Sequence, residues 1–247
     1  MSSATAGELR AAACLRLLSL ALTPPSQPRR AAVVDLARAL ADAHAEVADG
    51  VDVGLLAEAF EETPLERHLA SYDRLFGRGV ALAPYESSYE RDPFRQARVL
   101  SDVAGFYSAF GAGAHGPASE RPDHAGAELE FLGLLSERRV AALEAGQADD
   151  AERIREIEDA FLVDHAGRWL PGFFRAIADA DPAGALGAVG IVGEQVIVAE
   201  LVARGLGELA SRPLARAPRT SVELDEVQCA ADVSPQPTVP GAGMPPL

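Results

Sequence analysis

Residues 120–132 gather side chains whose types and spacing could do chemistry. The segment reads ERPDHAGAELEFL, so Asp123 and His124 stand side by side at the start of a strongly helical run, with Glu120 before them and Glu128 after them. An adjacent carboxylate and imidazole can exchange protons, ligate a metal ion or hydrogen-bond a guanidinium group. The alternative is that Asp123 only caps the helix and His124 is incidental, because a carboxylate satisfies N–H groups in the first helical turn.

The sequence contains none of the common catalytic signatures. It has no G-x-S-x-G nucleophile elbow, no Walker A sequence and no G-x-G-x-x-G after a strand. Neither Cys14 nor Cys229 stands beside a histidine. The many paired carboxylates are typical of solvated helix surfaces in an acidic protein. We therefore expect a protein that is not an enzyme.

A metal site is a second possibility for the same residues. His124 and Glu128 are four positions apart, so on a helix they share a face and could ligate one ion. His165, next to Asp164, could complete the site if the two helices pack together. No H-E-x-x-H sequence is present, and both His165 and His68 lie on apolar helix faces, where a buried histidine bonded within the core is favoured. A small metal-binding protein or enzyme using His124, Glu128 and His165 is thus the alternative hypothesis, and no cofactor is expected.

The charge balance indicates a solvated acidic helix surface that would also attract a basic partner. The chain has 37 acidic and 22 basic residues, the latter all arginine, and a formal net charge of −15. Such a chain is a poor nucleic-acid ligand, since duplex binding depends on neutralising phosphates, but it attracts basic partners. The carboxylate of Asp123 can accept charge-assisted hydrogen bonds from a guanidinium group, and His124 can donate or accept beside it. In this interpretation the segment begins a helix and presents its polar end to a peptide.

Helix-start signals and apolar periodicity predict the elements that position these residues. Thr63-Pro64-Leu65-Glu66 reads as a capping box, and Asp92-Pro93 and Asp181-Pro182 each place an acidic cap before a proline. The apolar stretch from Ala185 keeps a 3.6-residue period despite its β-branched residues, which favours a helix over a strand. Helices are predicted over about 7–22 and 28–48, after residues 63, 92 and 123, and from 150 and 185.

The pattern as a whole predicts an all-α fold. No alternating strand pattern of useful length occurs, and we expect one helical domain over residues 1–210. Residues 211–247 are rich in proline and lack periodicity, so we expect a disordered tail. No stretch of ~18 uninterrupted apolar residues occurs and no convincing secretory signal, so we expect a cytoplasmic protein without membrane insertion.

Three segments of this sequence stand out as motifs: the central ERPDHAGAELEFL, the upstream PYESSY at 84–89, and the downstream FLVDHAGRWLPGFF at 161–174, which has an F-x3-H-x3-W-x-P-x-F pattern. Together they resemble the motifs of the TorD/DmsD/NarJ family of chaperones for molybdenum-dependent redox enzymes. The resemblance covers residues 60–210 well. In the central motif the matching residues are Glu120, Pro122, Asp123, His124, Glu128, Leu129 and Phe131.

The resemblance implies an all-helical chaperone without a cofactor. Its partner would be the apo catalytic subunit of a molybdopterin oxidoreductase, bound often through an N-terminal twin-arginine leader peptide. The chaperone would keep the subunit competent for cofactor insertion and delay its export. The family's leader-binding role carries over to Asp123 and His124, with Glu120 and Glu128 of the same motif beside them. Tyr85 and Glu86 match the upstream motif and are expected in the same groove, whereas Trp169 is expected mainly to pack.

Overall fold

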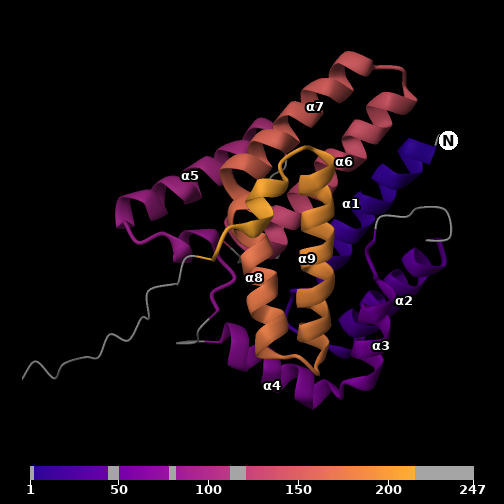
Figure 1. The fold of residues 1–247 in the computed structure, drawn as a ribbon, viewed down its shortest axis with the longest axis vertical. Helices are drawn as coiled ribbons and strands as arrows, with labels where there is room; N and C mark the ends of the chain where they lie inside the picture. The colour runs from indigo at the N-terminus through magenta and orange to yellow at the C-terminus, as the bar shows by residue number, and fades with distance from the viewer. Residues whose placement is uncertain (1–2, 44–49, 78–81, 112–120, 215–247) are drawn as a thin grey trace, which may run out of the picture.

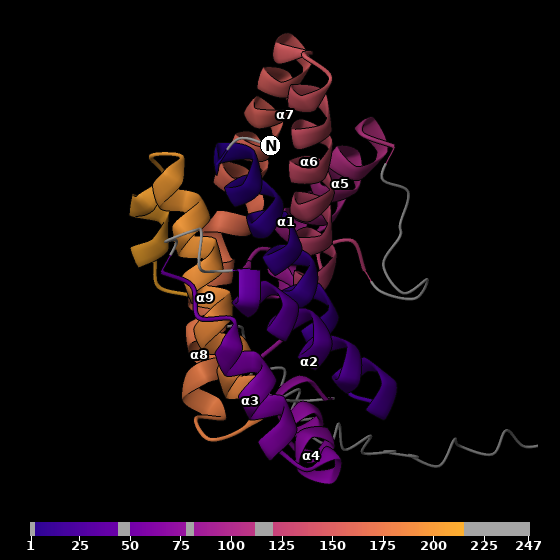
Figure 2. The same ribbon diagram turned by 90° about the vertical axis from the view of Figure 1, so that its right-hand side faces the viewer.

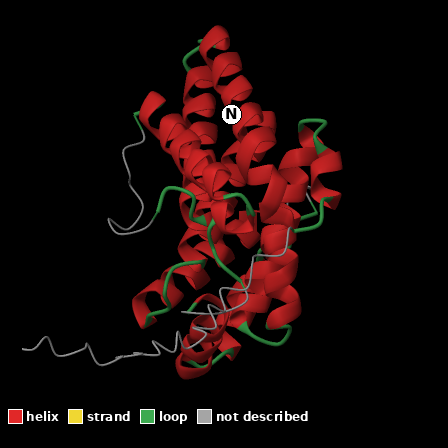
Figure 3. Cartoon of the chain, turned by 90° about the vertical axis from the view of Figure 1, so that its left-hand side faces the viewer, coloured by secondary structure: helices red, strands yellow, loops and turns green. Residues whose placement is uncertain are grey.

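The computed structural model describes residues 3–43, 50–77, 82–111 and 121–214, and all statements below concern this part of the chain (Figure 1). It consists of helices and loops, with no strand among the described residues beyond one isolated bridge between Tyr85 and His124 (Figure 3). The predicted all-α fold is confirmed.

The first four helices build one side of the bundle (Figure 2). The first of them packs mainly against the sixth helix, and the second packs against the third. Both helices predicted in the first 48 residues are confirmed, the second as far as Asp42, and residues 44–49 lie outside the described part. The bounds are α1 (Ser3–Ala21), α2 (Gln27–Asp42), α3 (Gly54–Glu62) and α4 (Leu65–Phe76).

The remaining helices form two pairs and a flanking helix. The sixth and seventh helices pack as a hairpin that projects at the top of Figure 1. The eighth and ninth helices lie side by side near the centre of the same view. A π-helical turn joins the seventh helix directly to the eighth. The bounds are α5 (Pro93–Ala109), α6 (Ala125–Glu144), α7 (Ala148–Phe161), the π turn η3 (Leu162–Ala166), α8 (Gly167–Ala180) and α9 (Ala185–Ala203), with short 3-10 helices η2 (Glu86–Tyr89) and η4 (Gly207–Ser211).

Of the three proline-containing helix starts, one is confirmed and two are wrong. The Asp92 carboxylate accepts a hydrogen bond of 3.0 Å from the Phe94 N–H and caps α5. Thr63 instead ends α3, because Pro64 has an extended backbone and α4 begins after it without a side-chain cap. Asp181 ends α8 and accepts from Ser71 Oγ at 3.0 Å, so its carboxylate ties α8 to α4 and α9 begins only after Gly184.

Helices α8 and α9 approach closely because α9 presents glycines to α8. A Cβ atom at Gly190 would lie 2.4 Å from the Ala178 backbone nitrogen and 2.6 Å from the Phe174 carbonyl oxygen. A Cβ atom at Gly193 would lie 2.3 Å from the Phe174 ring. Glycine is therefore required on this face of α9, since any side chain would push the two helices apart.

Helix α9 is long and apolar enough to cross a membrane by length and composition, with a mean hydropathy of 1.7. It is the one helix of the described residues that passes this test, and 61% of it is buried inside the structure. It contacts α8, α3 and α1, so its apolar side chains fill the bundle core. The helix predicted from residue 185 is thus confirmed as a central core element.

The described chain continues past residue 210 along the surface of α8. Leu209 in η4 is buried, and Arg175 of α8 donates to the carbonyl oxygens of Ala210 at 3.1 Å and Arg212 at 3.3 Å. Leu214 packs directly over Gly172. Residues 211–214 therefore lie against the helical body, and residues 215–247 of the expected tail are outside the described part.

Candidate functional site

The three sequence motifs, which are far apart in the chain, meet in the fold. The Glu86 N–H donates to the Asp123 carbonyl oxygen at 2.9 Å, and the Ala125 N–H donates to the Pro84 carbonyl oxygen at 2.8 Å. These bonds make the antiparallel bridge between Tyr85 and His124. The upstream segment is thereby fixed to the start of α6, and we call the region formed by residues 84–90 and 121–128 the motif corner.

Asp123 is completely buried and does not cap α6. Its Oδ1 accepts from Arg121 Nε at 3.1 Å, and its Oδ2 accepts from Arg121 Nη2 at 2.9 Å and from the Ser87 N–H at 3.0 Å. The alternative that Asp123 caps the helix is wrong, because a turn, closed by the His124 N–H on the Arg121 carbonyl, places Asp123 one position before the cap. Its carboxylate therefore turns toward Arg121 and η2.

His124 is the N-cap of α6. Its Nδ1 accepts a hydrogen bond of 3.0 Å from the Gly126 N–H, which satisfies one of the free donors of the first helical turn. An accepting Nδ1 carries no proton, so the neutral imidazole holds its proton on Nε2. The ring is nearly buried and packs edge-on against Tyr85, with 5.4 Å between the ring centroids.

Arg121 is a central member of the site that the sequence analysis missed. Besides its two bonds to Asp123, it donates to Ser87 Oγ, and its guanidinium carbon lies 4.6 Å above the centre of the Tyr85 ring. Its side chain is 45% exposed, whereas that of Asp123 is wholly buried. The spacing Arg-x-Asp across a proline turn was the available signal, because it allows a local bidentate ion pair.

Glu86 and His165 link the upstream and downstream motifs. His165 Nδ1 lies 2.9 Å from Glu86 Oε2, and both side chains are buried. The imidazole also packs against the rings of Phe106 and Phe161. The expectation of a core histidine at 165 is confirmed, since its polar atom is bonded to Glu86 within the core.

Glu128 and Trp169 form the second link between motifs. Glu128 is completely buried, and Trp169 Nε1–H donates to its Oε2 at 3.0 Å. Within the described part of the chain, Glu128 Oε1 has no hydrogen-bond partner. Burial raises the pKa of Glu128 well above its usual value, the nearby charges of Glu86 and Asp123 raise it further, and the Trp169 bond opposes them. The neutral acid is therefore favoured at this position. Trp169 packs as expected, and in addition it donates this hydrogen bond.

The structure gives no support to the metal-binding alternative. Among the residues it describes, no group of three or more histidine, cysteine, aspartate or glutamate side chains is arranged to hold an ion. The Nδ1 atoms of His124 and His165 are already engaged, by Gly126 and Glu86 respectively. Glu120 lies outside the described residues. The other five predicted site residues, which are Tyr85, Glu86, Asp123, His124 and Glu128, all belong to the motif corner.

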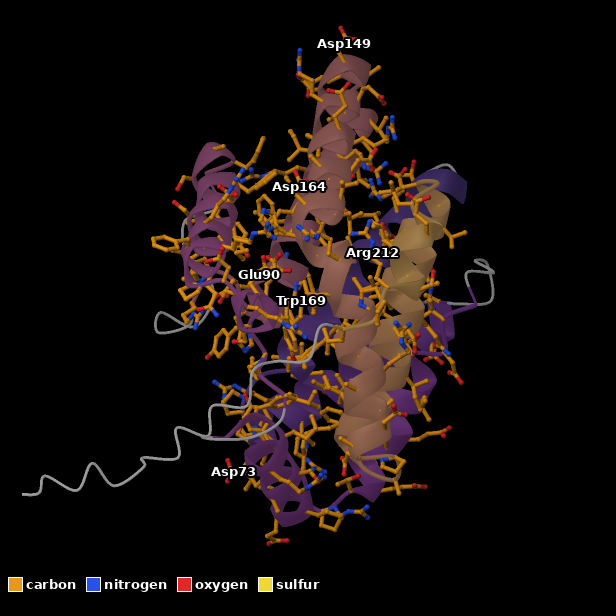
Figure 4. All side chains as sticks on the ribbon, turned by 60° about the vertical axis from the view of Figure 1, so that its left-hand side comes forward. Asp73, Glu90, Asp149, Asp164, Trp169 and Arg212 are labelled. Atoms are coloured by element: carbon orange, nitrogen blue, oxygen red, sulfur yellow. The ribbon has the colours of Figure 1, made fainter. Side chains whose placement is uncertain are left out.

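A pocket of about 270 Å³ opens beside the motif corner. Figure 4 shows Glu90, Trp169 and Arg212 on this face of the molecule, between Asp149 at one end and Asp73 at the other. The pocket combines aromatic and aliphatic surface with charges of both signs. Its lining residues are Glu86, Tyr89, Glu90, Val99, Arg168, Trp169, Arg212, Pro213 and Leu214.

A larger pocket of about 450 Å³ lies elsewhere, between α1, α6, α7 and α9. Its charged groups pair with one another: Arg204 bonds the buried Glu158 at 3.0 Å and Glu200 at 3.2 Å, and Ser136 Oγ donates to Glu158 at 2.7 Å. None of the three motifs lines it. The smaller pocket is therefore the better candidate for a site connected with the motifs.

The chain matches one protein-family model and is similar to several known chaperones. A family model described as nitrate reductase delta subunit matches residues 26–175. The selenate reductase assembly chaperone protein of Thauera selenatis is 33% identical over 131 residues, which is 53% of this chain and 66% of that protein. The chlorate reductase assembly chaperone protein of Ideonella dechloratans is 32% identical over 120 residues, covering 49% of this chain and 61% of that protein. The chaperone protein TorD of Aeromonas salmonicida is 32% identical over 125 residues, covering 48% and 52%. The chain thus spans about half to two thirds of the length of the curated relatives it matches.

Proposed function

Because the chain belongs to the nitrate reductase delta subunit family, we propose that it is an assembly chaperone for the catalytic subunit of a molybdenum-dependent oxidoreductase. The resemblance to the TorD/DmsD/NarJ family, first drawn from three motifs, is confirmed by this membership and by the similarity to a TorD protein. The chaperone acts in the cytoplasm, has no catalytic activity of its own and holds the apo subunit until its cofactor is inserted.

One observation carries this proposal. Two relatives at 32–33% identity are named as assembly chaperones of reductases, one for selenate and one for chlorate. The matched family region, residues 26–175, contains the whole motif corner and both links to the downstream motif, Glu86–His165 and Glu128–Trp169. The part of the chain that is similar to the named chaperones is therefore also the part in which the three motifs are bonded together.

We place client binding at the motif corner and the adjacent pocket. The predicted site residues Tyr85, Glu86, Asp123, His124 and Glu128 lie in the corner, and we retain Glu120 from the sequence motif. Most of these side chains are buried, so they hold the shape of the corner, whereas Tyr85 is only partly buried and offers a ring to the client.

The chemistry of this face suits a leader peptide. A twin-arginine leader combines guanidinium groups with an apolar stretch, and the pocket combines the carboxylates of Glu86 and Glu90 with the rings of Tyr89 and Trp169. The net charge of −15 would also speed association with a basic segment. We therefore propose that the client's leader, where it has one, binds here.

Two experiments test the proposal. In the host, deletion of this chain is expected to leave a molybdenum oxidoreductase with several-fold less metal per catalytic subunit, measured by elemental analysis, and the intact gene should restore it. Unchanged metal content and activity in every molybdenum oxidoreductase of the host would contradict the function.

The second experiment measures binding of the apo catalytic subunit to purified chaperone variants. Tyr85→Ala is expected to weaken binding about tenfold, as for an aromatic contact near the centre of an interface. Phe94→Ala is the matched control, because Phe94 on α5 is 88% exposed and lies outside the motif corner. Equal affinity of the two variants would place the client elsewhere.

A further inference from the structure

Arg121 occupies a complete guanidinium cradle on the motif corner. We define the cradle by the Asp123 carboxylate, the Ser87 hydroxyl and the Tyr85 ring. The carboxylate accepts two bonds, from Nε and Nη2, the hydroxyl accepts one from Nη2, and the ring covers one face of the guanidinium at 4.6 Å. This set of a bidentate acid, a neutral acceptor and an aromatic face is selective for guanidinium over ammonium groups.

The acceptors of the cradle are buried, whereas the side chain that fills it is partly exposed. Asp123 and Ser87 are 0% and 3% exposed, and Asp123 Oδ2 is additionally held by the Ser87 N–H at 3.0 Å. The Arg121 side chain, in contrast, is 45% exposed. Arg121 therefore reaches the cradle from the surface, and its departure would leave behind a buried carboxylate that still requires a cation.

We infer that the cradle is an arginine-binding site, filled by Arg121 in the free protein and taken over by an arginine of the client during binding. The identity of this client arginine rests on the proposed function, but the existence of the cradle does not. Arg121 then acts as an internal competitor: the apparent affinity for the client equals its affinity for the empty cradle multiplied by the fraction of time that the cradle is empty. Release of the client is assisted by the return of Arg121.

The cradle is tested without any client. Arg121→Ala is expected to lower the melting temperature, and millimolar ethylguanidinium should restore about 3–5 °C at about ten times its dissociation constant. Ethylammonium should restore less than a third of this. Arg98→Ala is the matched control, because Arg98 is an 81% exposed arginine paired with Asp102 on α5, and it should gain nothing from ethylguanidinium. Arg121→Gln serves in the same assay if the alanine variant does not fold. Equal effects of the two cations, or equal rescue of the Arg98 variant, would overturn the cradle.

The exchange is tested with a peptide carrying an Arg-Arg pair followed by leucines and with its Lys-Lys counterpart. Calorimetry should show the Arg-Arg peptide binding Arg121→Ala about tenfold more tightly than the natural chain, because the competitor is gone. The Lys-Lys peptide should show no such gain. Rescue by ethylguanidinium without tighter peptide binding would refute the exchange while leaving the cradle. The assembly function itself fails separately, if the apo catalytic subunit binds neither form of the protein.

Discussion

Replacing Asp123 with asparagine should destabilise the protein, although asparagine caps helices about as well as aspartate. The cap of α6 is His124, so Asp123 contributes through its charge and its three accepted hydrogen bonds. The bond from the Ser87 N–H to a buried carboxylate contributes about 1.5–3 kcal/mol, and the half-exposed Arg121 pair adds about 1 kcal/mol. Asparagine keeps one acceptor but turns an amide N–H₂ toward the donors of Arg121. The expected loss is about 3 kcal/mol, or about 6–12 °C in melting temperature for a domain of this size.

The matched control is the same substitution at Asp92. Asp92 is exposed and caps α5 by accepting from the Phe94 N–H, a role that asparagine fills within about 0.5 kcal/mol. Thermal melts of the two variants, recorded by circular dichroism at pH 7, compare a buried ion-pair partner with a true cap. If Asp123→Asn melts within about 2 °C of the natural protein, as expected for Asp92→Asn, the buried carboxylate does not stabilise the motif corner and our reasoning is wrong.

Three further predictions follow from the packing and charge of the described residues. Gly190→Ala should lower the melting temperature by more than about 5 °C, because its Cβ atom would meet backbone atoms of α8 at 2.4 Å. The control Gly105→Ala has open space around it on α5 and should raise stability by about 0.5–1 kcal/mol. An unchanged melting temperature for the Gly190 variant would contradict the close helix contact. Burial raises the pKa of Glu128, so the unfolded chain loses this proton at lower pH than the folded protein, and the acid destabilises the fold as pH rises. The melting temperature of Glu128→Gln minus that of the natural protein should therefore increase from about pH 5 to 8. A flat difference would show that Glu128 does not titrate this way. Ending the chain after Leu214 should leave the melting temperature within about 2 °C of that of the full chain. Ending it after Leu206 removes the buried Leu209 side chain and should clearly lower the melting temperature. Equal melting temperatures of the two truncated chains would mean that residues 207–214 do not support α8.

The sequence predicted the helices well because their signal is local and repeated. The apolar period from Ala185 specified α9 even though its β-branched residues favour strands, since burial along 19 residues outweighs intrinsic propensity. The Asp92-Pro93 start was also correct. Thr63 and Asp181 show the limit of such signals: each has the composition of a cap, but each ends the preceding helix.

The sequence motifs predicted which residues lie together better than they predicted what those residues contact, and their part in client binding stays a prediction. The motifs named Glu86, Asp123, His124 and Glu128, and these residues do lie together. Their roles could not be deduced from spacing, because they depend on long-range partners: Glu86 meets His165 79 positions away, and Glu128 meets Trp169 41 positions away. The exchange of capping roles between Asp123 and His124 depends on a single turn that shifts the helix start by one residue.

Trp169 is the only tryptophan in the chain, and it lies where the motifs and the pocket meet. Its indole donates to Glu128 on one side, stacks near Tyr89 with 5.6 Å between ring centroids, and lines the pocket with the small part of its surface that is exposed. The tryptophan fluorescence of the protein therefore originates from a single indole inside the candidate site. Its emission wavelength reports the polarity of the pocket, and its intensity reports the state of the neighbouring carboxyl. Any segment that enters the pocket can thus be followed in real time in the unlabelled protein.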